Sequence, residues 1–214
     1  MKRTVAILVL CLSIFCFIAS AQADVGCCIG SFNKDYTLTG NGATDMVLVA
    51  EKQFGKKRGD FGYTGNWCAA FVNDCAMLAG QSDAIPFKTG NTHDCGNLLS
   101  AVKNAGGTVI YDGAVIETVN GAKAGDLIFY WNSTCYGHVG IMRDSSNTVE
   151  GNSGDQVQFG KPTWYTGGAT RITIVRPAYG ISYPCTPDSQ PTHFAAVHAR
   201  DITDNSAVIV TSVG

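Results

Sequence analysis

The chain has few charged residues and no long basic run, and these absences restrict its partners. Only 15% of its 214 residues are charged, and the densest basic cluster is the triplet at positions 56–58. The formal net charge is −2, and it becomes −4 once Lys2 and Arg3 are removed, because all 17 acidic residues remain. Nucleic acid is therefore not an expected partner, and strong electrostatic attraction to anionic bacterial surfaces is not expected either.

A second long apolar run is absent as well. Residues 4–18 form an uncharged, apolar run after Lys2 and Arg3, but a membrane span needs about 20 apolar residues. Residues 21–23, Ala-Gln-Ala, have the small-x-small form of a signal-peptidase site. We therefore expect residues 1–23 to be a signal peptide and the mature protein, from near Asp24, to be secreted and free of the membrane.

Cysteine is plentiful, and its count is informative. Seven of the nine cysteines remain after residues 1–23, and an odd number in an oxidising compartment favours one free thiol and three disulfides. A helix would keep Cys68 and Cys75 apart, because seven residues at a rise of ~1.5 Å separate their Cα atoms by ~10 Å, beyond the ~7 Å limit for a disulfide. The simplest arithmetic predicts a free Cys68 and leaves the connectivity open among Cys27, Cys28, Cys75, Cys95, Cys135 and Cys185.

Clusters with metal-ligand spacing are scarce. His93, Asp94 and Cys95 are adjacent, but three ligand types crowded on one turn lack the spacing of a zinc site. We therefore expect Cys95 to be in a disulfide, and we expect no metal and no cofactor.

The segment around Cys68 has the pattern of a buried helix. Apolar or small residues recur at intervals of four, three and four from Cys68 to Ala79, whereas Asn73 and Asp74 fall on the other side. Gly80 suits the C-terminus of this helix. Cys68 lies in the first turn, where unpaired backbone N–H groups and the helix dipole favour a thiolate. The alternatives are a small buried residue or half of a disulfide.

The remaining pattern places helices before strands. Helices are expected at residues 45–54, capped by Thr44, and at 94–104. Alternation and turn residues then predict strands at 108–111, 126–131, 138–143, 148–152, 157–159 and 171–176. This order predicts an α+β fold with N-terminal helices packed on a C-terminal antiparallel sheet.

Composition also suggests boundaries along the chain. Residues 24–43 are predicted to form an irregular arm tethered by disulfides of Cys27 and Cys28. Residues 44–178 form the main domain, and residues 179–214 are an extension that could add a strand or remain a tail.

A thiol nucleophile needs an imidazole to take its proton and a further group to orient that imidazole. Four histidines follow the signal segment, and His138 is the best placed, because it begins a strand at a sheet edge where a helix N-terminus could meet it. Gly140 points the same way and leaves room above the sheet. Glu150 and Asn152 share one face of the next strand, so either could orient His138. A half-exposed histidine and a simple turn are the alternatives.

These residues carry a resemblance to a known family. The Trp-Cys-Ala-Ala-Phe-Val and Gly-His-Val-Gly-Ile segments, with the stretches around them, resemble the CHAP family (cysteine, histidine-dependent amidohydrolases/peptidases) and related papain-like cell-wall hydrolases. The quoted segments are residues 65–72, 124–129, 137–141 and 149–152.

The resemblance, which covers roughly residues 44–177, implies a papain-like fold and the cleavage of an amide bond in the peptide part of bacterial peptidoglycan. By family analogy Cys68 is the nucleophile, His138 the base and Glu150 the orienting group, with Asn152 assisting. We accordingly expect a monomeric, antibacterial thiol hydrolase. Amidase and endopeptidase action are both open.

The sequence departs from the family pattern in one place. Many members carry a polar residue, often Gln, before the cysteine, where this chain has Trp67. The oxyanion would then rely on the Cys68 N–H and a further donor, with Asn66 and Tyr63 as candidates and Trp67 as a cleft residue. Asn132 begins a glycosylation sequon in the loop before His138. The competing interpretation is a disulfide-rich secreted binding module or toxin that uses the same fold without catalysis.

Overall fold

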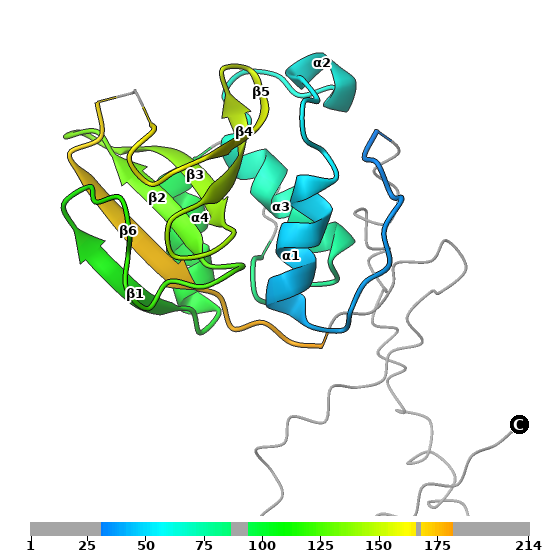
Figure 1. Cartoon of the computed structure of the whole chain (residues 1–214), viewed down its shortest axis with the longest axis horizontal. Helices are drawn as coiled ribbons and strands as arrows, with labels where there is room; N and C mark the ends of the chain where they lie inside the picture. Colours follow the sequence, from blue (N-terminus) through cyan, green and yellow to red (C-terminus); the bar gives the residue numbers. More distant parts are fainter. Residues whose placement is uncertain (1–30, 87–93, 166–167, 182–214) are drawn as a thin grey trace, which may run out of the picture. The chain divides into compact units, whose positions relative to one another are not determined.

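An antiparallel sheet of six strands organises the protein (Figure 1). The computed structural model describes residues 31–86, 94–165 and 168–181. The strands lie in the order β1-β6-β2-β3-β4-β5. All six match the strands expected from alternation, and the ends differ by at most two residues. Their bounds are β1 Thr108–Gly113, β2 Leu127–Trp131, β3 Tyr136–Met142, β4 Thr148–Ser153, β5 Gln156–Gly160 and β6 Arg171–Arg176.

Helices precede the sheet, as the α+β prediction requires. They are α1 Gly42–Glu51, the short α2 Arg58–Phe61, α3 Cys68–Leu78 and α4 Cys95–Asn104. The prediction of Thr44 as the cap of α1 is wrong. Asn41 caps the helix, because its side chain accepts a hydrogen bond from the Thr44 backbone N–H, and α1 therefore starts at Gly42, three residues earlier than expected.

Two hydrophobic clusters lie on the two faces of the sheet. The larger one joins α1, α3 and α4 to one face of the sheet, to which β2 contributes Leu127 and Phe129. The smaller one contains Ile128 and Tyr130 from the opposite face of β2, covered by loop residues such as Val119. The alternation within β2 thus assigns the helices to one face and loops to the other.

Helix α3 is buried on nearly every side, which differs from the expected amphipathic helix. Ten of its eleven residues are buried, Asn73 among them, because α1, α4, β3 and β4 all pack against it. Phe32, from the segment before α1, adds a further wall by stacking on Phe71 at a centroid distance of 6.0 Å. Only Asp74 is partly exposed. Gly80, just after the helix, has φ +66° as expected of a glycine that ends a helix.

The described part of the predicted arm, from residue 31 onwards, contains no regular element before α1. It is held by hydrogen bonds: the Asn33 N–H donates to Gln53 Oε1 at 2.8 Å, and Gln53 Nε2 donates to the Asn33 carbonyl at 2.9 Å. The expected tether through Cys27 and Cys28 lies outside the described residues, as does the predicted signal peptide.

The extension predicted from residue 179 begins against the domain. The Tyr179 hydroxyl donates to the Gly125 carbonyl at 2.5 Å, and the Gly180 N–H donates to Gln81 Oε1 at 3.0 Å. Residues 182–214 lie outside the described range. Within the described residues, no helix has the length and apolar character needed to cross a bilayer.

Candidate active site

Strands β3 and β4 separate at the point where α3 begins. They pair only at Ile141–Val149 and Met142–Thr148, although β3 continues back to Tyr136 alongside β2. Helix α3 contacts both strands. The expectation that His138 begins a strand at a sheet edge is wrong, because His138 is the third residue of β3, which is an inner strand. At His138, β3 faces the gap between β3 and β4. This gap lets the start of α3 meet residues of the sheet face that points away from the helices.

The meeting brings together Cys68, His138 and Glu150. Cys68 is the first residue of α3, and hydrogen bonding with His138 and with the Val139 backbone is among the causes that lower its pKa. The other side of the imidazole is fixed by Glu150, whose Oε2 lies 2.9 Å from His138 Nε2. The residues are 1%, 3% and 4% exposed, which makes this a buried line of three ionisable groups.

Glu150 is held by further donors from two strands. Thr148 Oγ1 donates to Glu150 Oε1 at 2.6 Å, and the Tyr130 hydroxyl donates to the same oxygen at 3.1 Å. Tyr130 is directly opposite His138 in the β2–β3 register. Both carboxylate oxygens are thus engaged, and the carboxylate cannot rotate without breaking hydrogen bonds.

The protonation states follow from these contacts. The hydrogen bond from Cys95 lowers the pKa of Cys68 most, and the hydrogen bond and charge of His138 lower it further, although burial opposes them. Burial alone would lower the pKa of His138, but its hydrogen bonds with Cys68 and Glu150 and their charges raise it to about 10. Burial would raise the pKa of Glu150, yet His138, Thr148 and Tyr130 hold it below its usual value. The resting site is therefore a thiolate–imidazolium pair backed by a carboxylate.

Two glycines make this arrangement sterically possible. A Cβ on Gly140 would lie 2.7 Å from Glu150 Cγ, so the glutamate reaches His138 only across a bare backbone. A Cβ on Gly151 would lie 2.5 Å from Phe71 Cγ, so α3 approaches β4 closely enough to present Cys68. The expectation that Gly140 leaves room above the sheet is confirmed.

Aromatic rings pack around the imidazole. Tyr165 stacks on His138 with a centroid distance of 5.0 Å and an interplanar angle of 0°, and the Tyr130 ring is 5.6 Å from it. Tyr165 comes from the β5–β6 connection and is partly exposed. It limits the orientations that the imidazole can adopt and separates it from solvent on that side.

Cys95 is the unexpected neighbour of this group. Its Sγ lies 3.6 Å from Cys68 Sγ, and Cys95 is itself the first residue of α4. The hydrogen bond to the Cys68 sulfur, burial and the charge of Cys68 all raise the pKa of Cys95. The same hydrogen bond therefore acts in opposite directions on the two thiols, because it lowers the pKa of Cys68 and raises the pKa of Cys95.

The predicted disulfide pattern is wrong. Cys68, Cys75, Cys95 and Cys135 are all free, so three of the six cysteines expected in bridges are not bridged. The reason is spatial, since Cys75 is buried in α3 and Cys135 is exposed on the β2–β3 connection. Cys27, Cys28 and Cys185 lie outside the described residues. The expectation of a free Cys68 is confirmed.

The residues expected to line a cleft lie in different environments. Trp67 is in the core with 0% exposure, and its indole N–H donates to Asp155 Oδ1 at 3.2 Å, so its side chain does not line a cleft. The Tyr63 hydroxyl donates to Asp74. Asn66 is exposed two residues before Cys68 and is the one of the three whose side chain lies at the surface near the helix start.

Asn152 does not join the group. It has φ +62° and sits where the β4–β5 register shifts between Glu150 and Ser153. The bulge breaks the period-two alternation, so the face shared with Glu150 is lost. The carboxylate partner of His138 among the described residues is Glu150.

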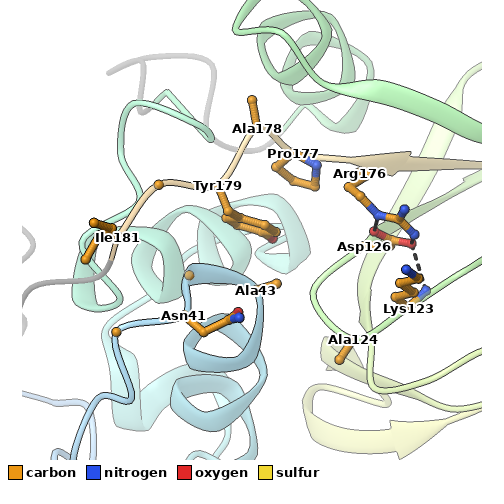
Figure 2. A pocket seen from close by; sticks show the side chains of 13 residues that line it. Asn41, Ala43, Lys123, Ala124, Asp126, Arg176, Pro177, Ala178, Tyr179 and Ile181 are labelled. Carbon is orange, nitrogen blue, oxygen red and sulfur yellow. Dashed lines mark hydrogen bonds and ion pairs between the residues drawn. The ribbon is translucent and has the colours of Figure 1, made fainter. Parts of the chain in front are cut away.

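A pocket of about 660 Å³ lies elsewhere on the domain (Figure 2). It is lined by the residues around the start of α1, the turn at Lys123 and the segment that ends at Ile181, and it includes none of the three ionisable residues of the site. Its carboxylate, Asp126, already accepts hydrogen bonds from Arg176 and from the Lys123 N–H. Within the described residues no cluster of metal-ligating side chains occurs.

Sequence reasoning missed several contributors. The role of Thr148 could have been predicted from the sequence, because Thr148 lies two residues before Glu150 and alternation puts both on one face. Tyr130 could have been found from its register with His138 once the strand pairing was known. No pattern points to Tyr165, which sits in a connection, or to Cys95, which packing brings to Cys68 across 27 positions.

The comparisons with known proteins agree with this geometry. Residues 58–159 match the family model of the CHAP domain, a range that holds Cys68, His138 and Glu150. A search of curated proteins found no match. CHAP domains are papain-like and are generally amidases or peptidases that hydrolyse peptidoglycan. The part of the chain from residue 58 to residue 159 is a CHAP domain.

Proposed function

We propose that this protein is a secreted, monomeric thiol hydrolase that cleaves an amide bond in the peptide part of bacterial peptidoglycan, with an antibacterial role. The observation that carries the proposal is the buried line from Cys68 through His138 to Glu150. The family match supports the substrate class, and the signal-like N-terminal sequence supports secretion.

The chemistry begins with the Cys68 thiolate, which attacks the carbonyl carbon of the amide. Negative charge then develops on the carbonyl oxygen. The backbone N–H of Cys68 supports this charge, because α3 has no side-chain cap at its N-terminus, and Asn66 is the candidate for a second donor. The His138 imidazolium protonates the departing amine, which leaves an acyl-enzyme on Cys68.

Deacylation uses the same groups in reverse. Neutral His138 takes a proton from water, the hydroxide attacks the thioester carbonyl, and the thiolate of Cys68 is restored. Glu150 keeps Nε2 protonated and the ring oriented in both steps, as its hydrogen bond at 2.9 Å requires.

Cys68→Ala tests the proposal directly. It should abolish the loss of turbidity of purified bacterial walls, because no other group replaces the attacking sulfur. Cys75→Ala is the matched control, since it removes a buried thiol from the same helix and should leave lysis intact. Wall lysis by Cys68→Ala with a native circular dichroism spectrum would refute the assignment.

The same walls distinguish the alternatives. Mass spectrometry of the released fragments identifies the amide that is cut and separates amidase from endopeptidase action. A wild-type protein that binds walls without releasing fragments would instead be a binding module. Counting free thiols alone does not decide, because Cys135 is exposed and free.

A further inference from the structure

We propose that Cys68 and Cys95 form a reversible disulfide, so that the active site carries its own redox modification site. The two sulfurs are 3.6 Å apart, which is contact distance, and nothing fits between them. A disulfide requires about 2.05 Å, so the sulfurs have to move together by about 1.5 Å, within the range of small side-chain rotations.

The surroundings favour the reaction at this pair. Cys68 and Cys95 are the first residues of α3 and α4, so the positive ends of two helix dipoles meet at the sulfurs. Both residues are buried, at 1% and 3% exposure, and α3 packs against α4. The attacking thiolate is Cys68, and Cys95 supplies the resolving thiol.

Hydrogen peroxide is a sufficient oxidant. The Cys68 thiolate attacks one peroxide oxygen, an S–O bond forms and the O–O bond breaks, and the hydroxide that leaves takes the proton held on His138. The Cys95 sulfur then attacks the sulfenic sulfur, an S–S bond forms, and the S–O bond breaks. Breaking the S–O bond releases a second hydroxide, which takes the Cys95 proton and leaves as water, so the two steps together produce two waters. A dithiol such as dithiothreitol returns two electrons and two protons and is oxidised to its cyclic disulfide.

The disulfide changes what the site can do. Cys68 in the bridge has no thiolate to attack a carbonyl, so the oxidised protein is inactive and the reduced protein is active. This consequence rests on the proposed function, whereas formation of the bridge does not. Bridging also protects Cys68, because a sulfenic acid without a resolving thiol proceeds to sulfinic acid, which dithiols do not reduce.

The first experiment maps the bridge without reference to hydrolysis. The full chain is treated with hydrogen peroxide, its remaining thiols are alkylated, and unreduced peptides are sequenced by mass spectrometry. We expect a cross-linked peptide pair containing Cys68 and Cys95, reversed by dithiothreitol. A bridge between Cys95 and Cys135, or peroxide-treated protein with Cys68 and Cys95 still alkylatable, would overturn the proposal.

The second experiment compares variants after peroxide and then dithiothreitol. Wild type should lose wall lysis by at least about 100-fold and recover it, because the nucleophile is blocked and then released. Cys95→Ala should instead accumulate about 32 Da on the Cys68 peptide and should not recover, whereas Cys75→Ala and Cys135→Ala should behave as wild type. Recovery of Cys95→Ala equal to wild type would contradict the resolving role. A mapped bridge without any wall lysis by the reduced protein would refute the proposed function and leave the redox site standing.

Discussion

The two ends of α3 carry buried thiols in opposite electrostatic surroundings. Cys68, at the first turn, receives hydrogen bonds and faces the charge of His138, which together lower its pKa. Cys75 lies seven residues along the same helix, where burial and the charge of Asp74 raise its pKa well above the usual value. Burial is nearly the same for both, so the partners alone decide which sulfur ionises.

The surroundings of Cys75 resist charge in general. The Tyr63 hydroxyl donates to the Asp74 carboxylate, and burial, opposed by this hydrogen bond, raises the pKa of Asp74 to about 6. Burial and the charge of Cys75 raise the pKa of Tyr36 to about 12. This end of the helix has no cation comparable to His138 in contact with Cys75 among the described residues, so nothing offsets the burial and the Asp74 charge that raise the pKa of Cys75.

The largest expected effect comes from removing the cation that distinguishes the two thiols. His138→Gln should raise the pKa of Cys68, because the thiolate loses its counter-charge while the hydrogen bond with Cys95 remains. Alkylation of Cys68 by iodoacetamide should then require a more alkaline pH than in wild type, and wall hydrolysis should fall by about 10²–10⁴-fold. Cys75→Ala, with His138 intact, is the control for the alkylation profile. An unchanged profile in His138→Gln would show that His138 does not set the ionisation of Cys68.

An intermediate effect is expected on stability at the other end of α3. The pKa of Asp74 is raised in the folded state, from 3.8 to about 6, so its contribution to stability is fully present below pH 3.8 and is lost as the pH rises through about 6. Asp74→Asn removes this loss, because the amide cannot ionise and its oxygen still accepts from Tyr63. The variant should therefore gain up to about 3 kcal/mol over wild type at pH 7.

Urea unfolding at several pH values between 4 and 8 measures this difference. Comparing the variant with wild type at each pH cancels the titration of other groups, such as Asp112 and Glu150, whose pKa values are lowered and act in the opposite direction. Asp83→Asn is the surface control, because Asp83 is exposed. A free-energy difference that does not change between pH 4 and pH 7 would contradict the raised pKa of Asp74.

The sequence predicted only part of the fold and of the surroundings that distinguish Cys68 from Cys75. Apolar runs separated by turn residues predicted all six strands, and the spacing of His138, Gly140 and Glu150 on two of them correctly put these residues together. The prediction that Asn152 shares a face with Glu150 was wrong, because Asn152, at φ +62°, lies in a bulge that breaks the alternation on which the prediction depended. Local periodicity also has no information on contacts between distant segments. The burial of ten of the eleven residues of α3, with Phe32 against the helix, and the contact of Cys95 with Cys68 therefore emerged only from the packed structure.

The smallest expected effect tests how Glu150 keeps the Cys68 end ionised. Tyr130→Phe removes the donor at 3.1 Å from Glu150 Oε1 but leaves Thr148 at 2.6 Å, so the carboxylate stays oriented toward His138. Wall hydrolysis should fall by less than about 10-fold, and the free energy of unfolding should fall by about 1.5–3 kcal/mol, as for the loss of one buried hydrogen bond to a charged group. The readouts are the rate of turbidity loss, the pH profile of Cys68 alkylation, and urea unfolding.

Tyr136→Phe is the matched control, because its hydroxyl contacts Thr173 and lies outside the Glu150 hydrogen bonds. If the Tyr130 hydroxyl has no positioning role, the pH profile of Cys68 alkylation should be the same in Tyr130→Phe as in Tyr136→Phe. A positioning role requires the Tyr130→Phe profile to move toward higher pH, because a less firmly held carboxylate stabilises the imidazolium less and the Cys68 thiolate with it.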